Sequence, residues 1–204
     1  MSDQHTDRRV AGETEADRFR RAAGRFSEII AAVPDSAWSN PACCTGWTTI
    51  DPIRHLNAWV PALFGKGGLD LTGRASAGDD PLVVWEELRA AIQAALDDPD
   101  VAGREIDLGP AGRHRVDRGI DQFVTGDVVV HAWDVATAAA LDWPIERIVD
   151  EQVAAEMAPA LTAIADMLVA SGHYAPAVPV ADNANAQERL IAATGRDPHW
   201  KPAS

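Results

Sequence analysis

Apolar residues recur every three or four positions in long stretches of the chain, and glycine, proline and aspartate occupy the gaps between these stretches. Such spacing places side chains on one face of a helix. A first helix is predicted from Glu13 to Val33, before Pro34, with an apolar face of Phe19, Ala22, Ala23, Phe26, Ile29 and Ile30. A second helix follows a cap at Thr48 or Thr49 and stops within residues 65–68, with an inner face of Leu56, Trp59 and Leu63.

The middle of the chain carries a mixed pattern. A third helix is predicted from Pro81 to Leu96, and residues 105–108 are predicted as a short extended piece before a turn at Gly109-Pro110. A fourth helix runs from about Gly119 to Ala140. Residues 128–130 are three valines that prefer a strand by propensity, whereas residues 136–140 favour a helix, and the prediction follows the latter.

A fifth helix is predicted to begin at Pro144 after a cap at Asp142 and to continue to Gly172, and a short helix is expected around Gln187 to Ala193. The pattern as a whole predicts an all-α, bundle-like domain at residues 13–173. A mobile leader at residues 1–12 precedes it, and a C-terminal extension at residues 174–204 is expected to pack on it.

Charge and composition exclude several classes of protein. The formal net charge is −13, and the sequence has no basic stripe, which argues against a nucleic acid or an anionic membrane as partner. Residues 1–7 lack the apolar core expected of a signal peptide, and no apolar run approaches about 18 residues, the length expected of a membrane span. Adjacent cysteines, Cys43 and Cys44, form no disulfide framework and fit a reducing compartment. We expect a cytoplasmic protein that is a monomer or a homodimer.

Two segments carry an acid and a histidine four residues apart: Asp51 with His55, and Asp127 with His131. On a helix such a pair shares a face and can hold one metal ion. With 31 acids and 6 histidines, about one such pair is expected by chance. The second pair stands out because it occupies an otherwise apolar helical stripe of Ile120, Val124, Asp127, His131, Val135 and Ala138. Buried polar side chains need partners, and either metal ligation or an Asp–His hydrogen bond would supply them.

Three separated segments resemble a known family. Cys44-Thr45-Gly46-Trp47, followed by His55-Leu56, is similar to the Cys-x-Gly-Trp segment of the DinB-like metal-binding proteins related to mycothiol-dependent maleylpyruvate isomerase. Residues 127–136 resemble the acid-x3-His-x-Trp-Asp-Leu-Ala segment, with Val135 in place of leucine. The segment Gly195-Arg196-Asp197-Pro198 is similar to the closing motif of an actinobacterial branch.

This resemblance implies a DinB-like four-helix bundle with an additional helix, and a divalent metal held by His55, Asp127 and His131. Zn²⁺ is the first candidate ion, with Ni²⁺ or Fe²⁺ as alternatives, because a His/carboxylate set suits all three. Asp127 stands where the isomerase has glutamate, so it would reach the metal directly or through water, or leave the ion to two histidines. Asp51 is a reserve ligand, although a carboxylate in the first helical turn also interacts favourably with the helix dipole.

Other residues near these segments have two interpretations each. Asp134 could accept the second ring proton of His131 or pair with a buried arginine. Trp47, Trp59 and Trp133 could border a pocket, but aromatic residues at such positions are mostly core.

Arg196 and Cys44 also have both a functional and a structural interpretation. Arg196 could bind an anionic substrate group, or pair with Asp197 or a helix end. Cys44 could be a nucleophile, or a small buried hydrophobic residue.

The resemblance implies a metal-dependent thiol transferase or isomerase that acts on a small electrophilic substrate through a metal-bound thiolate. The partners would be that substrate and a low-molecular-weight thiol, with mycothiol as a cofactor. Two alternatives stay open: a hydrolase with metal-activated water, and a metal- or ligand-binding bundle without turnover.

Overall fold

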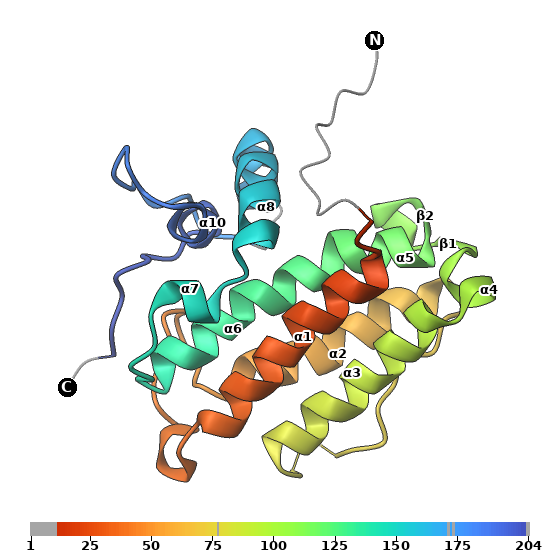
Figure 1. Ribbon diagram of the computed structural model, residues 1–204, viewed down its shortest axis with the longest axis horizontal. Helices are drawn as coiled ribbons and strands as arrows, with labels where there is room; N and C mark the ends of the chain where they lie inside the picture. The colour runs from red at the N-terminus through yellow and green to blue at the C-terminus, as the bar shows by residue number, and fades with distance from the viewer. Residues whose placement is uncertain (1–11, 77, 171, 173, 203–204) are drawn as a thin grey trace.

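A computed structural model describes residues 12–202 except 77, 171 and 173, and its architecture is all-α with one very short hairpin (Figure 1). Of the expected leader at residues 1–12, only Gly12 lies within the described residues. The main helices are α1 (Glu15–Ala32), α2 (Asp51–Lys66), α3 (Pro81–Asp97), α6 (Gly126–Ala138), α8 (Glu151–Ala163) and α10 (Ala186–Ala193). The shorter elements are η1 (Asp35–Ala37), α4 (Pro99–Ala102), β1 (Glu105–Asp107), η2 (Gly109–Ala111), β2 (Arg113–Arg115), α5 (Val116–Gly119), η3 (Ile120–Thr125), α7 (Ile145–Ile148) and α9 (Ala165–Ala170).

Local capping fixes where the first helices begin. Thr14 and Asp17 form a capping box at the start of α1, in which each side chain bonds to the backbone of the other residue. The side chain of Asp80 accepts a hydrogen bond from the backbone of Leu82, and Pro81 occupies the first turn of α3. α2 differs from the expectation, because neither threonine caps it: Ile50 is its first flanking residue, without a side-chain cap.

α1, α2, α3 and α6 pack side by side, so that α1 and α2 each contact both α3 and α6 (Figure 1). α6 is buried on nearly all sides, because α8 and α10 also pack against it. A helix surrounded by protein can be apolar all round, and this explains how the three valines at 128–130 are accommodated in a helix despite their strand propensity. Tertiary packing therefore outweighs local propensity at the centre of the fold.

The segment before α6 is a π-helix rather than part of one continuous α-helix. Ile120–Thr125 connects α5 to α6 with this wider turn. A π-helical turn changes which residues face the core along a helix, and such turns are frequent at functional sites. The predicted helix from Gly119 to Ala140 is therefore correct in extent to within three residues but contains an irregular turn directly before Asp127.

The predicted long fifth helix is wrong as a single element. It is divided into α7, α8 and α9, and α7 begins at Ile145 without a cap from Asp142. The division before α8 has a local cause: the side chain of Asp150 accepts hydrogen bonds from the backbone of Gln152 and Val153 and so starts a new helix.

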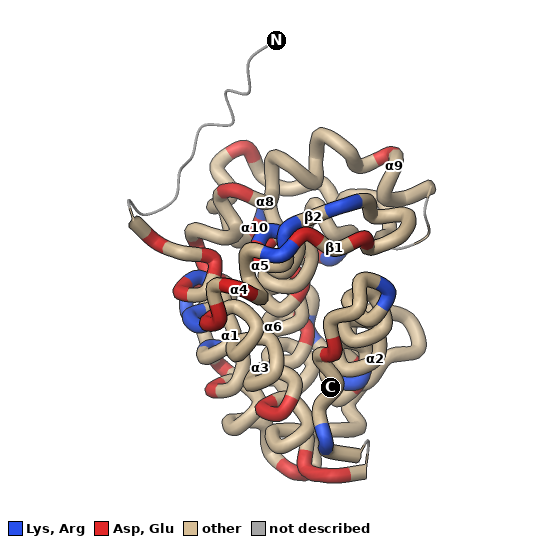
Figure 2. Tube along the Cα trace, turned by 90° about the vertical axis from the view of Figure 1, so that its right-hand side faces the viewer, with Lys and Arg blue, Asp and Glu red and all other residues tan. Residues whose placement is uncertain are grey.

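The extended piece predicted at residues 105–108 is confirmed at Glu105–Asp107, and it pairs antiparallel with Arg113–Arg115. The short C-terminal helix is confirmed at Ala186–Ala193, where it packs chiefly on α8. Acidic residues are distributed over helices and loops, with basic residues between them (Figure 2). Within the described ranges, the helices are all too short or too polar to cross a membrane.

Candidate metal centre

Three donor side chains from two helices meet at one point of the bundle. Asp127 and His131 lie one turn apart on α6, and His55 reaches them from α2. Nε2 of His131 lies 3.4 Å from Oδ2 of Asp127, and Nε2 of His55 lies 3.8 Å from the same oxygen. One potential ligand atom of each residue lies within 4.8 Å of the other two. The structure thus brings together the three residues proposed as ligands from the sequence.

Two tryptophans border this donor group. The indole N–H of Trp59 donates a hydrogen bond of 3.0 Å to Oδ2 of Asp127. The ring of Trp47 stacks on that of His131 with a centroid separation of 5.8 Å, and it lies 5.3 Å from the ring of His55. Trp59 therefore orients the carboxylate, while Trp47 contacts both imidazoles.

The two ring nitrogens of His131 have different surroundings. Nδ1 lies 2.8 Å from Oδ2 of Asp134, and because an ionised carboxylate only accepts, Nδ1 is the donor. Nε2 is buried and has no hydrogen-bond partner among the described residues. An unpartnered buried nitrogen is costly, whereas a histidine that donates from one nitrogen to a carboxylate and offers the other to a metal is a common arrangement. The orphaned Nε2 therefore fits a cation between His131, Asp127 and His55.

The charges of the donor group influence one another. Burial by itself lowers the pKa of His131, but the negative charges of Asp127 and Asp134, together with the hydrogen bond to Asp134, outweigh it and raise the pKa to about 9. Burial raises the pKa of Asp127, yet the charge of His131, with that of His55, holds it below its usual range. Burial and the charge of His131 lower the pKa of His55. The metal-free site therefore keeps an ionised carboxylate between the imidazoles, and a metal would have to displace the proton of His131.

The spacing of the donors suits a small divalent ion. Two nitrogen or oxygen ligands at about 2.1 Å from one tetrahedral zinc ion are separated by about 3.4 Å, which is close to the distances found here. The His55 side chain is 40% exposed, whereas that of His131 is 4% exposed, so the group is open to solvent on the His55 side. Three protein ligands with an accessible side are typical of a catalytic rather than a structural site.

Asp134 links the donor group to two further segments. It is 1% exposed and accepts hydrogen bonds from Nε of Arg196 at 2.7 Å and from Nη2 at 2.8 Å. Sγ of Cys43 donates to its Oδ1 at 3.2 Å. Burial raises the pKa of Asp134, but the charge of Arg196, with hydrogen bonds from His131 and Arg196, holds it far below its usual range. Both interpretations of Asp134, the histidine partner and the buried ion pair, are therefore realised together.

Of the two structural partners expected for Arg196, the helix end is found and Asp197 is not. Nη1 donates to the carbonyl of Thr194, the C-cap residue of α10, and the guanidinium pairs with Asp134 rather than Asp197. Gly195 has a φ of +80° directly after α10, a left-handed conformation that glycine adopts without strain and that reverses the chain toward α6. Because Asp134 engages one edge of the guanidinium through Nε and Nη2, and the carbonyl of Thr194 accepts from Nη1, all three nitrogens of Arg196 already have protein partners.

Two other predicted residues lie outside the donor group. Oδ2 of Asp51 accepts hydrogen bonds from the backbone and hydroxyl of Thr48, and Oδ1 accepts from Arg54, so Asp51 stabilises the start of α2. Trp133 is 1% exposed and lies in the hydrophobic core, which is the second of the two interpretations given for it.

Tyr174 belongs to the neighbourhood of the site but was missed. Burial and the charge of Asp127 raise the pKa of Tyr174 to about 12, which places the phenol within electrostatic reach of the donor group. It follows α9 in an irregular segment, where neither periodicity nor a motif marks it. Only the three-dimensional arrangement reveals its position.

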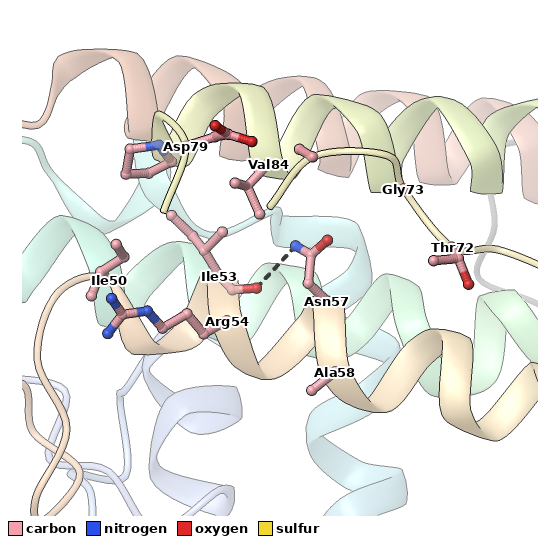
Figure 3. A pocket seen from close by; sticks show the side chains of 11 residues that line it. Ile50, Ile53, Arg54, Asn57, Ala58, Thr72, Gly73, Asp79 and Val84 are labelled. Atoms are coloured by element: carbon pink, nitrogen blue, oxygen red, sulfur yellow. Dashed lines mark hydrogen bonds between the residues drawn. The ribbon is translucent and has the colours of Figure 1, made fainter. Parts of the chain in front are cut away.

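A separate pocket of about 280 Å³ lies between α2 and the segment that leads into α3 (Figure 3). It is lined by apolar side chains such as Ile53 and Val84 and by the polar Arg54, Asn57 and Asp79. These α2 residues lie on a different helical face from His55, so the pocket is separate from the His55/Asp127/His131 group.

No protein-family model, curated protein or solved structure matches the chain. A function can therefore be proposed only from the chemistry of the donor group and from the sequence motifs around it.

Proposed function

We propose that the protein is a metal-dependent thiol S-transferase or isomerase, built on a DinB-like four-helix bundle, that uses a small thiol such as mycothiol on an electrophilic substrate. His55, Asp127 and His131 would hold the divalent ion. The observation that carries the proposal is the buried Nε2 of His131, which lacks a hydrogen-bond partner among the described residues and faces a carboxylate and a second imidazole.

Residues around the donor group prepare it for a cation. Asp134 holds one ring proton of His131 on Nδ1, so that Nε2 is the nitrogen that faces the site and that would bind a cation in exchange for its own proton. Trp59 fixes the position of the Asp127 carboxylate through its N–H group. Trp47 packs on the imidazoles and restricts the access of water from its side. A bound divalent ion would lower the pKa of a coordinated thiol and so supply a thiolate near neutral pH.

The choice of a thiol as co-substrate is supported by the resemblance of residues 44–47, 127–136 and 195–198 to thiol-dependent relatives. The accessible side of the group, where His55 is 40% exposed, leaves room for a small molecule to reach the ion. A fourth ligand position filled by substrate or thiol is the general arrangement of catalytic zinc sites.

The first test is metal content. Tag-free protein is reconstituted with Zn²⁺, Ni²⁺ or Fe²⁺ and dialysed, and bound metal is measured by elemental analysis in wild type, H131A and H199A. We expect H131A to hold about one ion per chain less than wild type, and H199A to match wild type, because His199 is exposed and outside the donor group. Equal metal content in H131A and wild type would contradict the metal site.

The second test is thiol dependence. Metal-loaded and metal-free protein are assayed with mycothiol, glutathione and cysteine against activated alkenes and haloarenes. We expect acceleration only when both metal and thiol are present, and its loss in H131A. Hydrolysis of test esters that is indifferent to thiol would replace the thiol proposal with the hydrolase alternative while leaving the metal site intact.

A further inference from the structure

The two cysteines of the chain lie in a tight turn beside the metal centre. Both are free and half-buried. The turn is closed by an isolated bridge between Pro41 and Thr48, and the backbone N–H of Trp47 donates to the carbonyl of Cys44 at 3.0 Å. Gly46 has a φ of +80°, as the third position of a type II turn requires. The backbone that carries both thiols is therefore fixed by its own hydrogen bonds.

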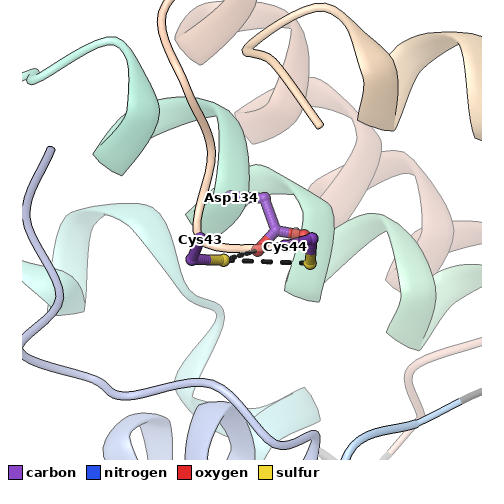
Figure 4. A group of neighbouring side chains, drawn as sticks. All are labelled: Cys43, Cys44 and Asp134. Carbon is purple, nitrogen blue, oxygen red and sulfur yellow. Dashed lines mark hydrogen bonds between the residues drawn. The ribbon is translucent and has the colours of Figure 1, made fainter. Parts of the chain in front are cut away.

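The separation of the thiols suits a shared cation. Their Sγ atoms lie 3.9 Å apart, next to the carboxylate of Asp134 (Figure 4). Two thiolates at about 2.3 Å from one tetrahedral ion are separated by about 3.8 Å. A disulfide would instead require the sulfurs to approach to about 2.0 Å. Cys43 and Cys44 can thus chelate one ion with almost no change in position.

The surroundings also favour a cation at this place. Asp134 lies next to the thiols, and one ligand atom from each of the three residues lies within 4.8 Å of the others. Because Asp134 already accepts from Arg196 and His131, its role here is to orient Cys43 and to add negative charge. Arg196 compensates part of the charge that two thiolates would introduce.

The thiols differ in how readily they lose a proton. The hydrogen bond with Cys43 lowers the pKa of Cys44 to about 7 despite burial, with help from the charges of Arg196 and His131. The hydrogen bond with Cys44, burial and the charge of Asp134 raise the pKa of Cys43. A cation would therefore meet the Cys44 thiolate first and displace the proton of Cys43 second.

We propose that Cys43 and Cys44 form a second cation site, separate from the His55/Asp127/His131 group, which binds one soft, thiol-preferring divalent cation. On binding, two sulfur–metal bonds form and the protons of the two thiols pass to solvent, so neither an oxidant nor a reductant is needed. Thiolates select soft ions, whereas imidazole and carboxylate suit harder ones, so the two sites differ in preference. The proposal does not depend on the function of the first site.

Cadmium ions alone, added to tag-free full-length protein, test the proposal. Thiolate-bound Cd²⁺ absorbs in the ultraviolet by charge transfer from sulfur, and because the chain has two cysteines, the band reports on this pair alone. We expect one sulfur-bound Cd²⁺ per chain in wild type. In C43S and in C44S we expect the affinity to fall on the order of a hundredfold, because the second ligand is no longer held in place. An absent band, or an unchanged affinity in either variant, refutes chelation.

Two controls separate the alternatives. H55A should keep the sulfur band and lose a second, sulfur-independent equivalent of Cd²⁺, whereas loss of the band in H55A would show one common site and overturn the proposal. The oligomeric state measured by light scattering, whether monomer or dimer, should be the same before and after Cd²⁺ addition. A dimer that forms only with Cd²⁺ would mean that the ion bridges two chains.

Protection of wild-type thiols from iodoacetamide by one equivalent of Cd²⁺ supplies a test that requires no variant, and unprotected thiols would overturn the proposal.

Discussion

Replacing Arg196 with methionine should strongly destabilise the fold, because it removes the cation that neutralises a buried carboxylate. Arg196 bonds to both oxygens of Asp134, and Asp134 is 1% exposed. Methionine keeps much of the volume of the arginine stem, so the change tests charge rather than packing. His131 and Cys43 still donate to Asp134 after the change, but neither supplies a permanent charge.

Removing one partner of a buried ion pair costs about 3–5 kcal/mol. Since two other donors stay in place, we expect the lower end of this range, about 3 kcal/mol, or a fall of roughly 6–12 °C in Tm for a domain of this size. The matched control is R20M. Arg20 pairs with Asp17 and Asp97, but its side chain is 46% exposed, and exposed pairs contribute about 0–1 kcal/mol.

Urea denaturation followed by circular dichroism measures both variants at neutral pH. Adding D134N to R196M should recover part of the lost stability, because it removes the stranded charge. Lower pH should also reduce the difference in free energy of unfolding between R196M and wild type. Without the charge and hydrogen bonds of Arg196, the pKa of Asp134 in the folded state is less depressed, so the variant loses less stability than wild type as the pH falls below about 5. An R196M variant within about 1 kcal/mol of wild type at neutral pH would refute this reasoning.

Three further predictions follow from single contacts. G195A should lower the free energy of unfolding, measured by urea denaturation, by about 2 kcal/mol or more, because alanine is strained at φ +80° and its Cβ would lie 2.7 Å from the backbone oxygen of Ala175. The control is G24A, which lies in open space on α1 and should be neutral or stabilising by up to about 1 kcal/mol. W59F should weaken Zn²⁺ binding in a calorimetric titration by about 10- to 100-fold, because the carboxylate ligand loses its orienting N–H donor, and an unchanged affinity would show that this bond is dispensable. The free energy of unfolding of the metal-free protein should fall as the pH rises from about 6.5 through 9, because the pKa of His131 is about 9 in the folded state and 6.5 in the unfolded chain. H131A should lack this loss.

The sequence predicted the long helices because their periodicity and caps are local properties. The face of α1 is buried as predicted from its spacing. Prediction failed where side chains compete with the helix backbone, as at Asp150, and where the tertiary structure selects an unusual turn, as in the π-helix at Ile120–Thr125. The partner strand Arg113–Arg115 was missed because three residues carry no detectable alternation.

The donor group could be proposed because two of its members lie on one helical turn and the third lies in a segment that resembles a family. Its supports could not be derived in the same way. Arg196 stands 62 residues from Asp134 in sequence and pairs with it only because Gly195 reverses the chain. The contact between Cys43 and Asp134 likewise depends on how the turn before α2 lies against α6. Long-range polar pairs of this kind leave no periodic signal in a single sequence.

The position of Arg196 also changes how the C-terminal extension should be regarded. An extension that merely packs on a bundle could be removed at the cost of exposing some apolar surface, but this one supplies the counter-ion of Asp134 and covers α8 through α10. Asp134 in turn holds His131 and Cys43, so both donor groups rest on a residue that the extension neutralises. A chain that ended near residue 173 would leave a buried carboxylate without its permanent cation. Residues 13–173 and 174–204 are therefore one unit with respect to the site, although the sequence pattern divides them.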